Sequence, residues 1–421
     1  MLSKNNYDII ILGGGISGLF IAYQLSKKDK SVLLIEKSKR YGGRIYTEQK
    51  NNYSYECGAA RFHSSHTKLL SLLDELQMSE DIIELPSVLK HILRKKERNF
   101  DYKTDYKLKL DELLQQAVSK KKEFNKEKLH KVTFFQYLIS IFDFETASFI
   151  KDAFGYDSEI IELNAEAALQ MFSNDLFSEN KYYVLKKGLS GVIQLLVSIL
   201  EKRENVTMLN DCVMSEMDDK TITIPQGKFF YKKLICAIPP SSLKEINYFK
   251  DNQSLDAVKA IPLMRIYAKY PIHNNRVWFK DIKRTTTDNY LRHIIPINYK
   301  EGLIMISYTD GLYAEIWKQL HSCGEGILVK HLHKEIKDLY QIDPPKPEYI
   351  SVHYWDEGLH VWKPGFQMKQ LYKQILQPEK DIPIFLCGEG FSKKQGWIEG
   401  CLETCYDVIN KLDIPGINMK N

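Results

Sequence analysis

A glycine-rich turn near the N-terminus constrains the fold of this chain more than any other feature of its sequence. Gly13, Gly15 and Gly18 follow the spacing Gly-x-Gly-x-x-Gly, directly after the apolar stretch 7–12. The residues after the turn have the periodicity of a helix, and a second apolar stretch occupies residues 31–35. A strand, a glycine turn, a helix and a second strand in this order predict a β-α-β unit.

The residues of this unit have distinct roles in binding a dinucleotide. Gly13 allows the tight turn, Gly15 leaves room for a pyrophosphate, and Gly18 lets the helix and the strand pack closely. The phosphates would lie at the start of the helix, near Ser17, where free N–H groups and the helix dipole favour anions. Glu36, at the end of the second strand, is suited to accept a hydrogen bond from a ribose hydroxyl. The sequence therefore predicts a dinucleotide site.

The composition is that of an ordinary globular protein and excludes several functional classes. The chain has 421 residues, of which 44% are hydrophobic and 27% are charged. A chain of this length is expected to divide its core over about two or three domains. The 59 Lys and Arg and the 54 Asp and Glu leave a net charge of +5. This charge is too dilute for a nucleic-acid-binding face, so we expect no nucleic-acid partner.

The apolar stretches and the cysteines indicate the location of the protein. A membrane span needs about 18 to 20 apolar residues, and the longest candidate, residues 9–25, is interrupted by four glycines. We therefore expect no membrane partner and no signal peptide. The seven cysteines contain no C-x-x-C pair, and no ligand cluster indicates a metal site. These features favour a reducing, cytoplasmic location.

The hydrophobic periodicity divides the chain into interleaved domains. Residues 64–202 have a mostly helical pattern, and strand-like alternation returns after residue 206. We predict a mixed α/β (α+β) fold, in which a Rossmann-like nucleotide-binding domain carries an inserted substrate domain of mixed sheet plus helices. The nucleotide-binding domain is expected at 1–75, 181–245 and 346–421, and the substrate domain at 76–180 and 246–345, with 83–170 a largely helical insertion. The Lys-rich segment 119–131 is expected to be a solvated helix face or loop.

Two segments near the ends of the chain resemble one known family. After Glu36 come Arg40 and the run Gly42-Gly43-Arg44, which resembles the E-x-x-x-R-x-G-G-R segment of the flavin-dependent amine oxidase family. This family includes monoamine, polyamine and L-amino-acid oxidases. The segments 384–389 and 396–400 resemble its second signature, and the middle of the chain matches more weakly. The resemblance covers roughly half of the chain and implies an FAD cofactor.

The resemblance also implies which further residues contact FAD. In the family, residues matching Arg40 and Arg44 lie beside the cofactor, and the residue matching Val213 meets the adenine. Glu389 matches an acid that contacts the hydroxyls or phosphates of FAD, and the helix start at Ile398 would direct its dipole toward the flavin. The cofactor residues expected in this way are Arg40, Gly43, Arg44, Gly58, Ala59, Arg61, Val213, Gly388, Glu389, Trp397 and Ile398.

The family oxidises a C–N bond by moving a hydride equivalent to flavin N5, and O2 then reoxidises the flavin to give peroxide. A residue at the position of Trp397 often forms an aromatic wall facing the flavin, although a core tryptophan is the alternative. The segment 353–365 resembles the family's aromatic segment ending in Pro-Gly, so His360 and Trp362 are further candidates for the substrate pocket. Monoamine oxidases carry a flavin-linking cysteine in this segment. None is present here, so we predict a noncovalent flavin.

Two arginines are candidates for residues that determine the substrate. Arg61 follows a segment that resembles the family's Gly-Ala segment, and several amino-acid oxidases bind the substrate carboxylate with an Arg at this point. Alternatively, Arg61 holds the FAD phosphate region or pairs with a buried acid. Arg265 occupies the position of a Lys that in the family binds a water near flavin N5. Lys269 is four residues further along the strand, about 13 Å away at 3.3 Å per residue, so the two cannot share that place.

Three functional hypotheses follow from these observations. The first is an FAD-dependent oxidoreductase acting on an amine or L-amino acid, with O2 as electron acceptor and with Arg265 and Trp397 at the reacting centre. The second is a flavoenzyme of the same fold that dehydrogenates, desaturates or isomerises a non-amine, because an Arg stays charged and cannot act as a base. The third is an FAD-stabilised interaction protein without catalysis.

Overall fold

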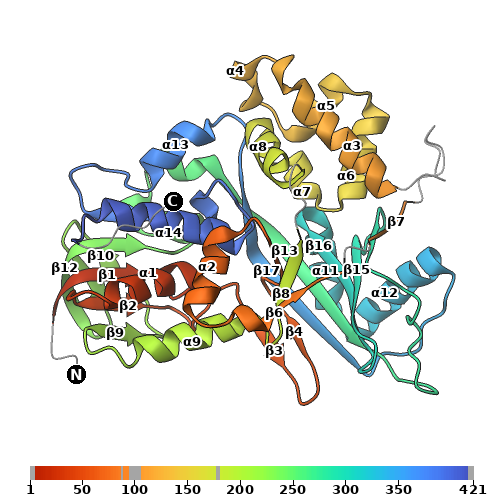
Figure 1. Ribbon diagram of the computed structural model, residues 1–421, viewed down its shortest axis with the longest axis horizontal. Helices are drawn as coiled ribbons and strands as arrows, with labels where there is room; N and C mark the ends of the chain where they lie inside the picture. The colour runs from red at the N-terminus through yellow and green to blue at the C-terminus, as the bar shows by residue number, and fades with distance from the viewer. Residues whose placement is uncertain (1–4, 87–88, 94–105, 177–180, 416–421) are drawn as a thin grey trace.

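The computed structural model describes residues 5–86, 89–93, 106–176 and 181–415. Figure 1 shows a sheet flanked by helices at the left, a second sheet at the right, and a group of helices above them. Segments from both ends and from the middle of the chain build the left-hand sheet, so residues far apart in sequence meet there. The mixed α/β architecture predicted from the sequence is confirmed.

The first sheet is built around β1 (Asn6–Leu12), whose isoleucines are buried on both faces. It pairs in parallel with β2 (Val32–Ile35) and β12 (Gly227–Cys236). The remaining strands are β9 (Val206–Leu209), β18 (Ile384–Leu386) and an antiparallel edge of β10 (Glu216–Met217) and β11 (Thr221–Ile224). β2, β18 and residues 9–12 of β1 are entirely apolar, as expected for parallel strands that helices cover on both faces.

Helices cover this sheet and place their first turns near its carboxyl edge. The completely buried α1 (Ile16–Ser26) packs against α9 (Ser190–Leu200) and α14 (Ile398–Lys411). α14 also packs against α2 (Thr67–Glu75). The other small elements nearby are β3 (Thr47–Gln49), β4 (Ser54–Glu56), β5 (Phe62–His63), β6 (Ile82–Glu84), β8 (Tyr182–Leu185), α10 (Pro240–Lys244) and α13 (Met368–Ile375).

The second sheet has the order β17-β13-β16-β15-β14-β7. Its strands are β17 (Tyr349–Trp362), β13 (Val258–Lys269), β16 (Leu303–Asp310), β15 (His293–Asn298), β14 (Thr285–Thr287) and β7 (Lys90–Ile92). One face carries α11 (Gly311–Ser322), which packs against α12 (Glu325–Tyr340). β17 lies in the range 346–421, which we assigned to the nucleotide-binding domain, yet it pairs with β13 over almost its whole length. The predicted domain boundary at residue 346 therefore does not coincide with the division between the two sheets. The alternating polarity of a strand does not reveal which sheet the strand joins.

The helices above the two sheets share one core cluster with residues of β13 and β17. They are α3 (Tyr106–Ser119), α4 (Lys126–Leu129), α5 (Phe134–Ile141), α6 (Phe144–Phe154), α7 (Asp157–Ile161) and α8 (Ala165–Leu176). A capping box between Thr133 and Gln136 begins α5, and Asp143 caps α6. These caps satisfy N–H groups that the helices leave free at their starts.

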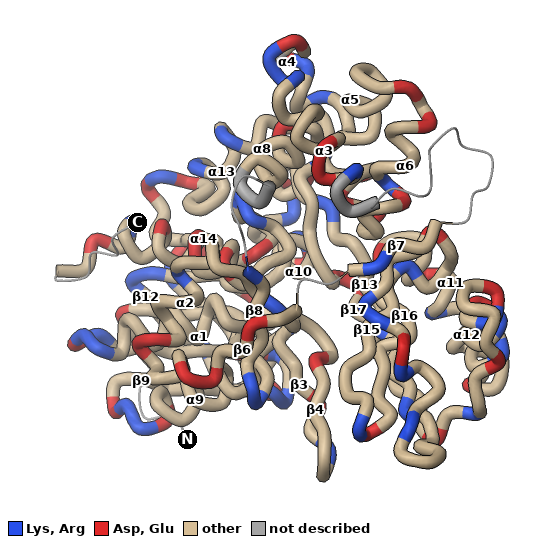
Figure 2. Tube along the Cα trace, turned by 45° about the vertical axis from the view of Figure 1, so that its right-hand side comes forward, with Lys and Arg blue, Asp and Glu red and all other residues tan. Residues whose placement is uncertain are grey.

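The surface charges are mixed. Figure 2 shows basic and acidic residues interspersed along the chain, with both signs on α12 and around β9. Among the described residues, no helix is both long enough and apolar enough to span a bilayer. No group of three or more potential metal ligands is found in the same part of the chain.

Candidate active site

A single cavity of about 2160 Å³ extends from the glycine-rich turn to the second sheet. Gly15, Glu36 and Val213 line one end of it, and Arg61 and Arg265 line the other. Pockets for ordinary small ligands have volumes of about 300–1,000 Å³. The cavity is therefore large enough for a long dinucleotide together with a second molecule.

The glycine-rich turn has the geometry that its sequence predicts. Gly13 has a φ of +102°, and a Cβ there would lie 2.5 Å from the carbonyl oxygen of Ala237. A Cβ on Gly18 would lie 1.9 Å from the carbonyl oxygen of Gly13, so the helix and the strand need this glycine to pack. A Cβ on Gly15 would meet nothing within 4 Å, which leaves open space beside the start of α1.

This open space fits a pyrophosphate. Gly15 is the N-cap of α1, and no described side chain caps the helix. The first N–H groups of α1 and its dipole therefore favour an anion in the cavity. Ser17, in the first turn, also lines the cavity.

Glu36 lies at the end of β2 and holds the glycine-rich turn. Its Oε2 accepts a hydrogen bond of 2.7 Å from the N–H of Gly14, and its Oε1 accepts one of 2.8 Å from Ser38. The carbonyl of Glu36 accepts from the N–H of Cys212, which places the exposed Val213 beside it on the cavity wall. The carboxylate is thus fixed at the point where a ribose would follow the phosphates.

The loop after Glu36 crosses the glycine-rich turn. The N–H of Gly42 donates to the carbonyl of Gly14 over 2.8 Å. Arg40 donates to the carbonyl of Gly43 over 2.6 Å and to that of Ile45 over 3.2 Å. Both Arg40 and Gly43 line the cavity. Arg40 therefore maintains the shape of its own loop through these hydrogen bonds. Its position in the sequence alone does not reveal this role.

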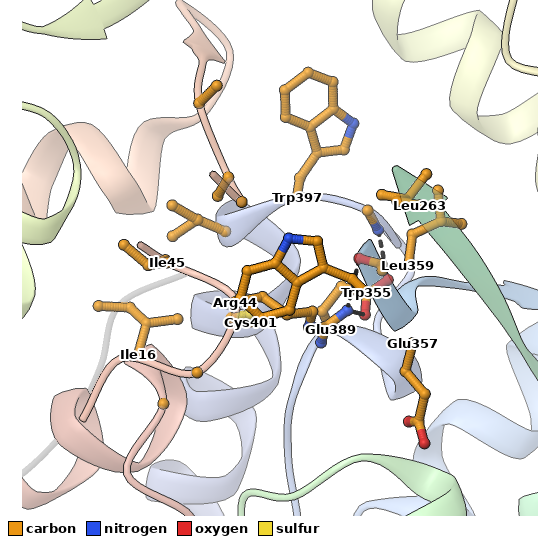
Figure 3. A pocket seen from close by; sticks show the side chains of 18 of the residues that line it. Ile16, Arg44, Ile45, Leu263, Trp355, Glu357, Leu359, Glu389, Trp397 and Cys401 are labelled. Carbon is orange, nitrogen blue, oxygen red and sulfur yellow. Dashed lines mark hydrogen bonds and ion pairs between the residues drawn. The ribbon is translucent and has the colours of Figure 1, made fainter. Parts of the chain in front are cut away.

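A buried charge network connects this loop to the C-terminal signature. Nη1 of Arg44 donates to Oε2 of Glu389 over 2.7 Å, and His360 Nδ1 lies 2.8 Å from the same oxygen. The other carboxylate oxygen accepts from the backbone N–H groups of His360 and Gly396. Figure 3 shows Arg44 and Glu389 meeting at the cavity wall. Glu389 thus positions Arg44 and the loop before α14 through four protein donors.

The network controls the protonation of its members. Burial alone would raise the pKa of Glu389, but the charges of Arg44 and His360 hold it well below its usual range. Burial alone would lower the pKa of His360, but the charge of Glu389 and the hydrogen bonds that His360 donates to Glu357 and Glu389 outweigh burial and raise it. Glu389 therefore remains a carboxylate.

The backbone around the predicted Gly-Ala segment approaches this network closely. A Cβ on Gly58 would lie 1.9 Å from the carbonyl oxygen of Arg44, and the N–H of Ala59 donates to that oxygen over 3.0 Å. Gly388 has a φ of +132°, and its N–H donates to Thr404. All three residues line the cavity. The two signatures, far apart in sequence, therefore form one wall.

Two indole rings project into the cavity (Figure 3). Trp397 is the N-cap of α14 and meets the rings of His63 and His66 edge-on, with centroids 5.3 and 4.8 Å away. Trp355, on β17, donates from its indole nitrogen to the carbonyl of Cys57 over 2.8 Å. Ile398 follows Trp397 at the uncapped start of α14, and both line the cavity.

His360 and Trp362 lie behind the cavity wall. Both are 1% exposed, and neither lines the large cavity. Trp362 donates from its indole nitrogen to the carbonyl of Ser392, while His360 bonds Glu389. In this geometry the two residues support the wall, and Trp355 supplies the aromatic ring from their segment. The bulge between Ile261 and Leu263 in the partner strand changes the register here, and sequence alternation does not show it.

Arg61 and Arg265 lie at the far end of the cavity. Arg61 donates to the hydroxyl of Tyr156 over 3.2 Å, and its guanidinium lies 4.8 Å from the ring centre of Tyr182. Arg265 donates to the carbonyl of Glu56 over 2.9 Å, with its guanidinium 4.5 Å from the ring centre of Tyr308. Neither guanidinium has a carboxylate partner among the described residues. The alternative that Arg61 pairs with a buried acid therefore finds no support in this geometry.

Lys269 lies outside this site. It is paired with Glu348 over 2.7 Å and does not line the cavity.

Several cavity residues carried no sequence signal. These are Tyr156, Tyr308, Arg284 and His293, all of which line the cavity. They come from four separate elements or loops, and no local motif surrounds them. The pairing of β14, β15 and β16 in one sheet, together with the α6–α7 junction, brings them together.

Comparisons with known proteins agree with this geometry. A family model described as flavin containing amine oxidoreductase matches residues 16–408. Achacin of Lissachatina fulica is 24% identical, over 97% of this chain and 93% of its own. Aplysianin-A of Aplysia kurodai is 20% identical, over 96% of this chain and 89% of its own. Among solved structures, a double mutant of putrescine oxidase has a TM-score of 0.75 at 18% identity, covering 96% of this chain and 99% of that one.

The family match includes α1, the Arg44 loop, the second sheet and α14 up to Val408. It confirms the resemblance that we stated from the motifs at the two ends of the chain. The fold likeness extends over nearly the whole chain as well. The chain therefore belongs to the family of flavin-containing amine oxidoreductases, and its cofactor is FAD.

Proposed function

We propose that this FAD-dependent oxidoreductase oxidises the carbon–nitrogen bond of an amino acid, with a noncovalently held flavin and O2 as the electron acceptor. The observation that carries the proposal is Arg61. Its guanidinium lines the cavity and contacts Tyr156 and Tyr182 but no carboxylate of the described chain. A half-buried cation in a cavity wall is stabilised by a ligand anion, and a planar guanidinium can hold a carboxylate through two hydrogen bonds.

The two signatures support one position for the flavin. The uncapped start of α1 and Glu36 fit the pyrophosphate and the ribose, while the start of α14 fits the flavin ring. When bound, FAD supplies the redox chemistry by accepting a hydride equivalent from the carbon that bears the nitrogen. Trp355 and Trp397 are placed to confine the substrate between apolar surfaces.

The positive charges at this end of the cavity favour the neutral form of the substrate's amino group. Arg61, Arg265 and Arg284 all line the cavity. Nearby positive charge disfavours an ammonium group and so favours the neutral amine, which carries the lone pair needed for oxidation. His293 stays neutral as well, because burial and the charges of Arg284 and Arg292 hold its pKa well below the usual range.

A noncovalent flavin is supported by the cysteines on the cavity wall. Cys401 and Cys212 line the cavity. Burial raises the pKa of Cys401 to about 12, so its sulfur remains a thiol rather than a reactive thiolate. Burial also raises the pKa of Cys212.

The proposal is tested with L-amino acids and their decarboxylated amines as matched pairs, such as L-phenylalanine and phenethylamine. We expect anaerobic bleaching of the flavin absorbance and peroxide release in air with amino acids. Bleaching by the amines alone would contradict the proposal. Bleaching followed by slow reoxidation in air would indicate a dehydrogenase instead.

The variant Arg61→Met tests the residue that carries the proposal. Because a charged hydrogen bond contributes about 1.5–3 kcal/mol, we expect KM for amino acids to rise about 10- to 100-fold. The KM of any carboxylate-free amine should change little. Lys269→Met, on the surface, is the matched control. Loss of FAD from Arg61→Met would show instead that Arg61 holds the cofactor.

A further inference from the structure

The far end of the cavity contains a third guanidinium beside those of Arg61 and Arg265. Arg284, which precedes β14, joins Arg61 and Arg265 on the cavity wall. Its buried Nε has no hydrogen-bond partner in the described part of the chain. Arg284 shares Tyr156 with Arg61 as a hydrogen-bond partner. Burial, and then the charge of Arg61, lower the pKa of Arg284 to about 10.

The acids near this cluster are already engaged. Glu56 offers Arg265 only its backbone carbonyl, because its carboxylate accepts from Leu189 and Thr47. Glu84 is paired with Lys181 over 3.0 Å. Asp111 and Glu159 also line the cavity, but no carboxylate of the described residues lies within ion-pair distance of the three guanidiniums.

The groups around the cluster are neutral hydrogen-bonding rings. The ring of Tyr156 lies 5.5 Å from that of Tyr308 and 4.4 Å from that of His293. Tyrosine hydroxyls both donate and accept, so they can complete the shell of a carboxylate without supplying charge. They cannot neutralise a guanidinium at neutral pH, since burial raises the pKa of Tyr308 further.

Charge balance then indicates the ligand. A single carboxylate neutralises one guanidinium, and the remaining cations, of which Arg265 is buried and Arg61 and Arg284 are half-buried, stay uncompensated at a cost in free energy. An amino acid with a second carboxylate carries two negative charges once its amine is neutral. We infer that the cavity selects dicarboxylic amino acids, with Arg61 on one carboxylate and Arg284 and Arg265 on the other. This inference rests on the proposed function.

The first experiment measures binding to the FAD-loaded protein by calorimetry, with glutarate, butyrate and 1,4-diaminobutane as probes. We expect glutarate to bind at least 10-fold more tightly than butyrate, and the diamine not to compete. Equal affinity for glutarate and butyrate overturns the inference, as does tighter binding of the diamine. Neither result depends on whether any substrate is oxidised.

The second experiment assigns the preference to residues. In Arg284→Gln the ratio of glutarate to butyrate affinity should fall toward one, while butyrate still binds. Lys269→Gln, whose side chain lies on the surface, should keep the wild-type ratio. An unchanged ratio in Arg284→Gln overturns the assignment. If that variant does not fold, the wild-type ratio alone decides the inference.

The third experiment separates this inference from the proposed function. The isosteric pair L-glutamate and L-glutamine is compared by kcat/KM, with the acid expected to be the better substrate by at least 10-fold. Glutarate selectivity without oxidation of any amino acid supports the inference and contradicts the proposed function. Oxidation of L-glutamine at least as efficiently as L-glutamate supports the proposed function and overturns the inference.

Discussion

At the scale of single residues, Arg265 shows how one substitution limits the chemistry of a site. Its guanidinium is held by the carbonyl of Glu56 and by the ring of Tyr308, while the nearest lysine on its strand is paired at the surface with Glu348. A guanidinium holds its proton throughout the range in which enzymes work. Arg265 can therefore orient an anion or a water but cannot take up a proton.

This leads to a prediction for Arg265→Met. The efficiency kcat/KM should fall about 10- to 100-fold, as expected for loss of a charged hydrogen-bonding group. The shape of its pH profile should remain that of the wild type, because Arg265 does not titrate. The measurement is kcat/KM against pH for wild type, Arg265→Met and the surface control Lys269→Met. A pH limb that disappears with Arg265 would contradict this role.

The glycines of the turn allow a sharper comparison. We expect Gly15→Val to fold with the stability of the flavin-free wild type, because Gly15 has an ordinary φ of −72° and open space around it. The same variant should retain no FAD, since the added methyl groups occupy the phosphate position. Gly18→Val, whose Cβ would lie 1.9 Å from a carbonyl oxygen, is expected to destabilise the fold itself. Flavin content and urea unfolding of the flavin-free proteins distinguish the two effects.

At the scale of secondary structure, the Arg44–Glu389–His360 network ties three separate elements together. Arg44 comes from the loop after β2, His360 from β17, and Glu389 from the turn after β18. Glu389 is 3% exposed, and its four donors fix the approach to α14. This part of the cavity wall is thus held by charge as well as by packing.

The raised pKa of His360 gives this network a pH signature. Protonated His360 contributes stability that is fully present below the pKa of an unfolded histidine, about 6.5. The contribution is lost as the pH rises through the higher folded-state value. The gap in unfolding free energy between wild type and His360→Gln should therefore be larger at about pH 6 than at about pH 9.

Urea unfolding at the two pH values measures this gap. His63 and His66, whose pKa values burial lowers to about 4 and about 2, titrate in both proteins and cancel in the difference. A gap that is independent of pH would mean that His360 contributes through packing alone.

The sequence predicted the elements close to the motifs and missed pairings that depend on distant partners. The β-α-β unit and the start of α14 follow from local apolar periodicity and from glycine spacing, so they were predictable. The pairing of β17 with β13 was not predictable, because the residues of a strand do not identify the strand with which it pairs. For the same reason Glu399, which lies inside the second signature, gave no sign that its carboxylate accepts from Lys68 and Leu69 at the start of α2.

The substrate end of the cavity was the least predictable part. Arg61 was identified because it follows a recognisable segment, but Arg284 and Tyr156 have no motif around them. Their meeting point depends on β14, on the α6–α7 junction and on the long strand β13 together. The lining of a cavity that is assembled from several elements in this way can be identified only when the whole fold is known.

At the scale of the whole molecule, one cavity joins the two sheets, and segments from both ends and from the middle of the chain line the space proposed for FAD. We expect added FAD to stabilise the flavin-free protein by about 2.7 kcal/mol at a free concentration of 100 times Kd. A thermal melt with and without FAD measures the shift. Glu36→Ala should lose most of it, because the ribose acceptor is gone. A full shift in Glu36→Ala would place the ribose elsewhere.

The open space at Gly15 has a consequence for the evolution of this sequence. At Gly13 and Gly18 any side chain would collide with neighbouring backbone atoms, so the fold itself excludes larger residues at these two positions. At Gly15 the described residues leave open space, so a larger residue there would conflict with the cofactor proposed to fill that space. A descendant that abandoned its cofactor would therefore accumulate substitutions at Gly15 first, while Gly13 and Gly18 stayed unchanged. This one position would record, in any lineage, whether the flavin is still in use.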